Sequence, residues 1–242
     1  MKANSIVHAG IFGLAIGDAL GVPVEFQSRV QLQKNPVKDM RGFGTHHQLP
    51  GTWSDDSSLT FCLAESLCVG YDLEAIAQSF LKWYHAEIWT PYGKVFDIGI
   101  ATTSAIRQIA NGITPVLCGG DKEQDNGNGS LMRILPLAFY LKDETDLQII
   151  FDKVKEVSSI THAHFRSVFA CFIYVVYAGA LIKGDSKIEA YYATRAQIQL
   201  FIRQNSFEAD EIQWFQRVIF ENIAELREEE ISSSGYVIHS LE

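Results

Sequence analysis

The stretch "GTWSDDSSLTFCLAESL", residues 51–67, places two adjacent carboxylates directly before an apolar run. Between Leu59 and Leu67 the apolar residues recur at intervals of three and four, which is the spacing of an amphipathic helix. Carboxylates in a first helical turn are favoured by the helix dipole. The stretch therefore predicts a helix that carries Asp55 and Asp56 at its N-terminal end.

The two carboxylates allow two interpretations. Ser54, Asp55 or Asp56 could each cap the helix by accepting a hydrogen bond from its first backbone N–H groups. One cap would suffice, however, and two ionised neighbours repel each other. A hydroxyl followed by two carboxylates is also a compact set of hard oxygen ligands suited to Mg²⁺. The residues alone leave both interpretations open.

Helical periodicity extends over most of the remaining chain, and no segment alternates with period two over a useful length. Asp72 is a plausible N-cap for the helix that follows it. The pattern predicts an all-α, compact multi-helix domain. The further helices are expected at about 6–19, 73–84, 99–111, 130–141, 144–158, 164–183, 186–204 and 209–228.

Composition narrows the class of protein. The 242 residues carry a net charge of −9, which argues against nucleic acid and anionic membranes as partners. The N-terminal apolar stretch resembles a signal peptide, but His8 and Asp18 interrupt it, and the apolar run 168–182 is short for a membrane span. We expect neither export nor membrane insertion.

The four cysteines form no CxxC pair and have no metal-ligand spacing. Scattered thiols in apolar surroundings are typical of buried cysteines in a reducing compartment. The sequence therefore predicts a cytoplasmic protein with buried, free cysteines.

Two further segments carry polar groups that helix formation alone explains poorly. In "GLAIGDALGVPVEF", residues 13–26, glycines and a proline fit the end of a helix, whereas Asp18 opposes the helix dipole there. In "DNGNGS", residues 125–130, backbone N–H groups could hold phosphate oxygens, although a plain loop with a helix cap explains the same pattern. A lone histidine in an apolar neighbourhood, such as His162, is more often structural than functional, and Asp97 could simply cap the helix near residue 99.

Taken together, these segments resemble the ADP-ribosylglycohydrolase family. The matching motifs stand in family order from about residue 9 to 180, with "SSGYVIHSLE" fitting further on: they are "GLAIGDALGVPVEF", "GTWSDDSSLTFCLAESL", "FDIGIATTSAI", "NGNGSLMRILPLA" and "THAHFRSVFAC". The resemblance implies an all-helical domain with a magnesium centre, usually of two ions, at the base of an ADP-ribose cleft.

The resemblance also implies roles for individual residues. Ser54, Asp55 and Asp56 take the positions of the family's metal ligands, and Ser54 keeps the hydroxyl where the family usually has threonine. Glu25 matches the acidic residue beside the metals. The positions that match substrate-binding loops are Asp97, Asn128, Gly129, Ser130 and His162.

The implied reaction is hydrolysis of the glycosidic bond that joins ADP-ribose to a protein side chain or a small acceptor. Metal ions lower the pKa of a bound water, and a carboxylate takes its proton. Glu25 and Asp55 are the two candidates for that catalytic carboxylate.

One family motif is absent from these 242 residues: the late Gly-x-Asp-x-Asp-Thr, which supplies the other half of the metal shell. We therefore expect a single domain, residues 1–242, that is incomplete at its C-terminus and binds one Mg²⁺, or binds Mg²⁺ weakly. We also expect apolar surface that favours association. The alternative is a catalytically inert relative that binds ADP-ribose or has a structural role.

Overall fold

The computed structural model describes the backbone of residues 3–242 and the side chains of residues 6–242. The first helices are α1 (Ala3–Gly21), α2 (Arg29–Lys34), α3 (Asp55–Val69), α4 (Leu73–Ala86), α5 (Ile100–Ala110) and α6 (Leu135–Tyr140). The others are α7 (Leu147–Ser159), α8 (Phe165–Lys183), α9 (Lys187–Gln204), α10 (Ala209–Gln213), α11 (Gln216–Ile219) and α12 (Val237–Leu241).

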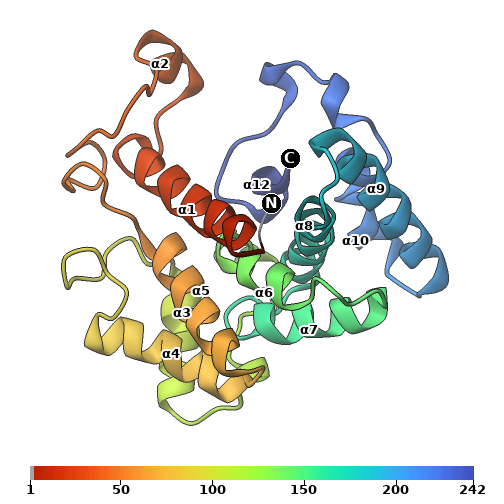
Figure 1. Ribbon diagram of the computed structural model, residues 1–242, viewed down its shortest axis with the longest axis horizontal. Helices are drawn as coiled ribbons and strands as arrows, with labels where there is room; N and C mark the ends of the chain where they lie inside the picture. The colour runs from red at the N-terminus through yellow and green to blue at the C-terminus, as the bar shows by residue number, and fades with distance from the viewer. Residues whose placement is uncertain (1–2) are drawn as a thin grey trace.

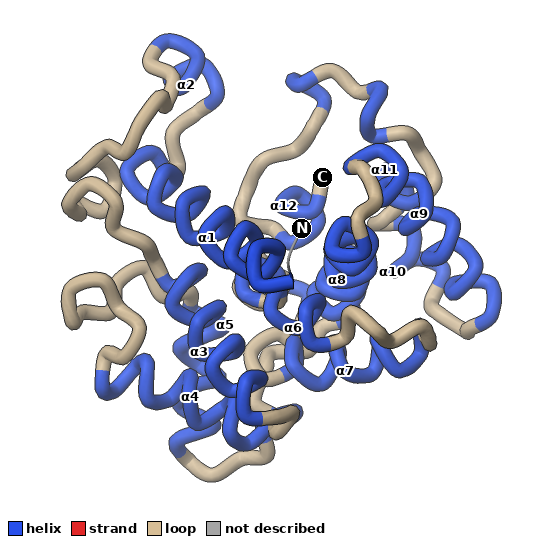
Figure 2. The backbone as a smooth tube through the Cα atoms, viewed as in Figure 1, coloured by secondary structure: helices blue, strands red, loops and turns tan. Residues whose placement is uncertain are grey.

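The prediction of an all-α fold is confirmed. Residues 3–242 form helices and loops, and their only β-type pairings are isolated bridges such as that between Gly127 and Tyr236 (Figure 2). Asp72 caps α4 as expected, because its Oδ1 accepts hydrogen bonds from the N–H groups of Glu74 and Ala75 at 2.9 and 3.2 Å.

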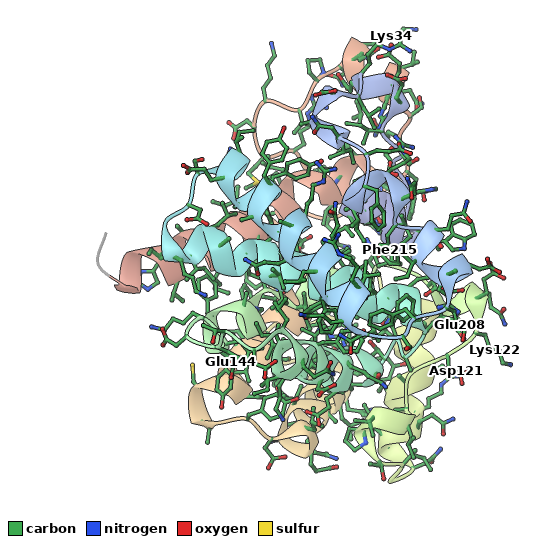
Figure 3. The ribbon with its side chains drawn as sticks, turned by 90° about the vertical axis from the view of Figure 1, so that its right-hand side faces the viewer. Lys34, Asp121, Lys122, Glu144, Glu208 and Phe215 are labelled. Carbon is green, nitrogen blue, oxygen red and sulfur yellow. The ribbon has the colours of Figure 1, made fainter. Side chains whose placement is uncertain are left out.

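Helix α8 is the centre of the larger helix group and packs against α6, α7, α9 and α12 (Figure 1). Its residues Phe169 and Phe172 are fully buried among other aromatic rings. Phe215, which Figure 3 labels inside the ribbon, is also fully buried and meets Phe169 edge to face at 5.1 Å. Burial of this kind stabilises by roughly 1.5–3 kcal/mol per large side chain.

Helix α3 joins this group to a second one, which contains α4 and α5 (Figure 1). Leu59 and Leu63 are fully buried where α3 packs against α4 and α6. A helix fixed on two sides holds its ends rigidly, so Asp55 and Asp56 at the N-terminus of α3 have defined positions.

An ion-pair network ties the C-terminal part of the chain to α8. The Arg166 side chain is only 7% exposed. It donates from Nε and Nη2 to both carboxylate oxygens of Glu211 at 2.9 and 2.8 Å, and from Nη1 to Glu123 at 2.9 Å. The guanidinium also lies 4.2 Å from the Trp214 ring centroid and contacts the Tyr236 hydroxyl. Arg166 thus connects four segments that are far apart in sequence.

Two helices of the described chain are long and apolar enough to cross a membrane, judged by length and composition. The apolar window in α8 is 61% buried, as in the core helix of a globular fold. The window Ile6–Val24, which includes most of α1, is only 17% buried, and Phe12 is 63% exposed. The expected exposed apolar surface is therefore present on α1, while its role in association stays a prediction.

The structure corrects several expectations. The helix expected at 130–141 is a 3₁₀ turn, Leu131–Arg133, followed by α6, because Pro136 fits only a first helical turn. The helix expected at 209–228 is split into α10 and α11. Helices α2 and α12 were not predicted. Three cysteines are buried as expected, whereas Cys68 is exposed.

Candidate active site

A cavity of about 370 Å³ gathers most of the residues singled out in the sequence. Its wall includes Glu25, Asp55, Asp56, Asp97, Asn128, Gly129 and His162. Ser54 lies just behind this wall as the N-cap of α3. Ser130 is fully buried and its hydroxyl accepts a hydrogen bond from Ser158 at 2.9 Å, so its side chain is not presented to the cavity.

Asp18 explains how the N-terminus of α3 is held. Its carboxylate accepts hydrogen bonds from the backbone N–H and hydroxyl of Ser54, at 2.9 and 2.8 Å, and from those of Ser57, at 3.1 and 2.6 Å. The Ser54 hydroxyl in turn accepts from the Asp56 N–H at 3.3 Å. The charge of Asp18 is unfavourable at the C-terminal end of α1 but favourable at the N-terminal end of α3. The sequence did not reveal this contact between the two helices.

We expect Asp18→Asn to lower the free energy of unfolding by about 1–3 kcal/mol, because the amide NH₂ would face donors and leave at least one of them without an acceptor. Thermal unfolding measures the effect. Asp72→Asn is the matched control, since Asp72 accepts both of its cap bonds on one oxygen, which asparagine retains. Equal stability losses in the two variants would contradict the role given to Asp18.

Asp55 and Asp56 do not act as caps. The Asp55 side chain is 5% exposed and makes no hydrogen bond to any other residue within 6–242. Burial, followed by the neighbouring charges of Asp56, Asp97 and Asp18, raises the pKa of Asp55 well above its usual range. Burial and the charge of Asp18 raise the pKa of Asp56 to about 7. Within residues 6–242, Asp55 and Asp56 thus have no ion pair with a basic side chain.

These shifts predict an unusual pH dependence of stability in EDTA. Between the ordinary aspartate pKa near 4 and a folded-state pKa of about 7, the folded chain binds more protons than the unfolded chain. The melting temperature should therefore fall as pH rises from 4 to 7. Asp55→Asn with Asp56→Asn should flatten this slope, and an unchanged slope in that variant would contradict the assignment.

Two loops contribute further acidic side chains to the cavity, beside Asp55 and Asp56. Glu25 and Asp97 both face His46, whose Nε2 lies 2.5 Å from Glu25 Oε2 and 3.6 Å from Asp97 Oδ2. Burial raises the pKa of Glu25, while its hydrogen bond to His46 opposes that rise. Asp97 does not cap α5, because the N-cap is Gly99 without a side-chain hydrogen bond. His46 was not predicted; its only signal is a position in a long glycine-containing loop.

The opposite wall is the glycine loop with His162. The His162 side chain is 2% exposed, and burial, reinforced by the nearby charge of Arg133, lowers its pKa to about 3. Its imidazole therefore stays neutral at physiological pH, with Nδ1 bonded to the Thr161 hydroxyl at 2.8 Å. Arg133 is fully buried and donates to the Gly129 carbonyl oxygen, which fixes the loop from below.

Gly129→Ala should lower the free energy of unfolding by about 1–3 kcal/mol, because a Cβ at this position would lie 2.7 Å from His162 Cε1. Denaturant titration measures the loss. Gly179→Ala, near the C-terminal end of α8, is the control: nothing lies within 4 Å of its added Cβ, so stability should stay equal or increase. Equal stability in the two variants would mean that the close approach of His162 does not restrict the residue at position 129.

With the all-helical fold and the carboxylate cavity established, comparison with known proteins defines the class. The family model for ADP-ribosylglycohydrolase matches residues 2–242. The chain belongs to the ADP-ribosylglycohydrolase family. A solved structure of an ADP-ribosylglycohydrolase-related protein complex aligns with a TM-score of 0.75 and 27% identity, covering 99% of this chain and 74% of that one.

Two curated relatives have named activities. ADP-ribosylarginine hydrolase Tri1 of Serratia proteamaculans is 32% identical over 238 residues, which cover 96% of this chain and 59% of that protein. The ADP-ribosyl-[dinitrogen reductase] glycohydrolase of Rhodospirillum rubrum is 32% identical over 164 residues, covering 66% of this chain and 52% of that protein. The chain thus spans somewhat more than half the length of these relatives.

Proposed function

We propose that this chain hydrolyses the glycosidic bond between ADP-ribose and a protein side chain, with arginine as the linked residue. The observation that carries the proposal is the cavity in which the buried carboxylate of Asp55, with Asp56 beside it, faces a neutral histidine and a glycine loop. The relative named as an ADP-ribosylarginine hydrolase supports the choice of arginine.

The residues of the cavity fit Mg²⁺. Asp55 is a buried carboxylate without a hydrogen-bonding partner in any other residue of the described range 6–242, and Asp56 and the Ser54 hydroxyl stand beside it. Hard oxygen donors of this kind suit a small divalent cation. Ser54, Asp55 and Asp56 would hold the ion. When bound, Mg²⁺ supplies positive charge that makes a nearby water easier to deprotonate.

The chain's own residues account for the remaining requirements. Glu25 and Asp55 are the two carboxylates that could accept the proton of the attacking water, since both line the cavity. The acidic wall stabilises the positive character of an oxocarbenium-like transition state. The backbone of Gly127 and Gly129 allows a substrate to approach closely, and neutral His162 adds no positive charge to oppose that transition state.

The test is release of ADP-ribose from an ADP-ribosylarginine peptide, with Mg²⁺ and with EDTA, alongside calorimetric titration of ADP-ribose under both conditions. We expect release only with Mg²⁺, and binding that Mg²⁺ strengthens. Release at the same rate in EDTA would contradict the magnesium-dependent mechanism. Binding without release in either condition would favour the inert, ADP-ribose-binding alternative.

A further inference from the structure

Exposed apolar side chains stand beside the opening of the carboxylate cavity. Ile100 lines the cavity and is 91% exposed. Phe26, which follows Glu25 of the cavity wall, is 82% exposed, and Phe43, which closes the turn that carries His46, is 61% exposed. We call Phe26, Phe43 and Ile100 the apolar rim. Large exposed apolar side chains that gather beside a polar cavity are a feature of binding surfaces.

The backbone beneath the two rim phenylalanines is strained. Phe26 and Phe43 have φ angles of 62° and 67°, in the left-handed region that glycine and asparagine adopt more easily. Strain of this kind clusters at functional sites. Because both rings lie mostly in solvent, packing against the rest of residues 6–242 offsets little of it. Contact with a bound molecule would account for aromatic residues at these two positions.

Contacts between two loops hold the rim in place. The loop between α2 and α3 is fastened to the segment after α1, because the Thr45 hydroxyl donates to the Glu25 carbonyl oxygen at 2.7 Å. The loop between α4 and α5 reaches the same place: the His46 ring has the rings of Phe26 and Phe96 as neighbours, with centroids 6.1 and 5.8 Å away (Figure 1). A surface that is fixed before a ligand arrives loses less entropy on binding.

A second, smaller hollow is formed by the same two loops. Its volume of about 150 Å³ is enough for one apolar side chain. Its lining consists of Gln48, Pro91, Tyr92, Lys94 and Phe96. Gln48 pairs with Phe43 of the rim, and Phe96 precedes Asp97 of the cavity wall. A main chain that crosses the rim could therefore place one residue in the cavity and a neighbouring apolar side chain in the hollow.

We propose that the apolar rim and this hollow form the docking surface for the polypeptide segment that carries the ADP-ribosylated arginine. The inference rests on the proposed hydrolysis and concerns the other side of the bond, away from ADP-ribose. Charge complementarity favours this occupant. The cavity wall presents the carboxylates of Glu25 and Asp97 to a positively charged guanidinium. Aromatic rings such as that of Phe26 also attract a guanidinium to their faces.

The test compares two substrates that share the same glycosidic bond. One is free ADP-ribosylarginine, and the other is a peptide that carries ADP-ribosylated arginine with a leucine on either side. We expect Phe26→Asn with Phe43→Asn to lower the ratio of kcat/KM for the peptide to that for the free compound by at least about 10-fold, through KM. Because asparagine tolerates a left-handed φ, the melting temperature should stay equal or rise, which a folding defect would not produce.

Phe12→Ala is the matched control, because Phe12 is 63% exposed but lines neither the cavity nor the hollow. It should leave the ratio unchanged. Tyr92→Ser should lower the ratio for the leucine peptide more than for a peptide with glycine at the same positions. An unchanged ratio in Phe26→Asn/Phe43→Asn, an equal loss on both substrates, or an equal loss in Phe12→Ala would overturn the proposal. A dimer that only the double variant dissociates, with the ratio unchanged, would assign the rim to a second copy of the chain.

Binding measurements separate this inference from the hydrolysis on which it rests. If the parent chain releases no ADP-ribose from either substrate, the hydrolysis is refuted, and calorimetry then tests the docking surface. The leucine peptide should bind the parent chain more tightly than ADP-ribose does and should lose that advantage in Phe26→Asn/Phe43→Asn. Equal affinities for the peptide and ADP-ribose in the parent chain would refute the docking surface alone, and binding of neither would refute both proposals.

Discussion

Asp55→Asn combined with Asp56→Asn is expected to abolish the rise in melting temperature that Mg²⁺ produces. At a Mg²⁺ concentration about 100 times the dissociation constant, binding stabilises the folded chain by about 2.7 kcal/mol. For a chain of this size that corresponds to roughly 5–11 °C. The double variant removes both carboxylate ligands, so its melting temperature should not respond to Mg²⁺, and ADP-ribose release should fall to background.

The same variant should not lose helix α3. Ser54 and Asp18 cap that helix, and asparagine is tolerated in a first turn. In EDTA the variant should even exceed the parent chain in stability at pH 7, because the buried carboxylate of Asp55 and the half-buried one of Asp56, which raise each other's energy, are gone. Glu228→Gln with Glu229→Gln changes the same charge on exposed neighbours and should retain the full Mg²⁺ response. A Mg²⁺ response that survives in Asp55→Asn/Asp56→Asn would place the ion elsewhere.

Arg166→Met is expected to lower the free energy of unfolding by about 3 kcal/mol, and the melting temperature by roughly 6–12 °C. The methionine would fill part of the volume but leave Glu211, whose side chain is 24% exposed, without its bidentate partner. The stacking of the guanidinium on Trp214 would be lost as well. Chemical denaturation followed by tryptophan fluorescence measures the loss in free energy of unfolding.

Arg227→Met is the appropriate comparison, since Arg227 also pairs with glutamates but has a side chain that is 70% exposed. Exposed ion pairs contribute about 0–1 kcal/mol, so this variant should unfold almost like the parent. Comparable losses in free energy of unfolding for Arg166→Met and Arg227→Met would mean that the ion pairs of Arg166 contribute no more to stability than exposed ones.

The sequence predicted the fold class because helical periodicity and caps are local signals. Asp72 and the apolar residues of α4 lie within a few positions of one another, so that helix was readable. The split between α10 and α11 was not, because its cause is tertiary. Trp214 stacks on Arg166 and Phe215 is buried against Phe169, and both contacts interrupt a segment whose own spacing favours one helix.

The candidate site was predictable to the extent that motifs carry it. Glu25, Asp55, Asp97 and His162 stand in segments that resemble one family, and the structure brings them to one cavity. His46 stands in no such motif, and it reaches Glu25 and Asp97 only because two loops fold over each other. Asp18 was noticed as an unexplained acid, but its partners on α3 are 36 and 39 positions away.

The Arg166 network also sets an order of events during synthesis. Its hydrogen bond to Tyr236 spans 70 positions, and its bonds to Glu211 span 45. At about 5–20 residues per second, a ribosome needs roughly 4–14 s to add the 70 residues that separate Arg166 from Tyr236. At the start of that interval Glu123 is the only one of these partners already synthesised, and the surface of α8 that packs against α12 stays uncovered until the interval ends. During this period the growing polypeptide exposes apolar surface that a chaperone could bind.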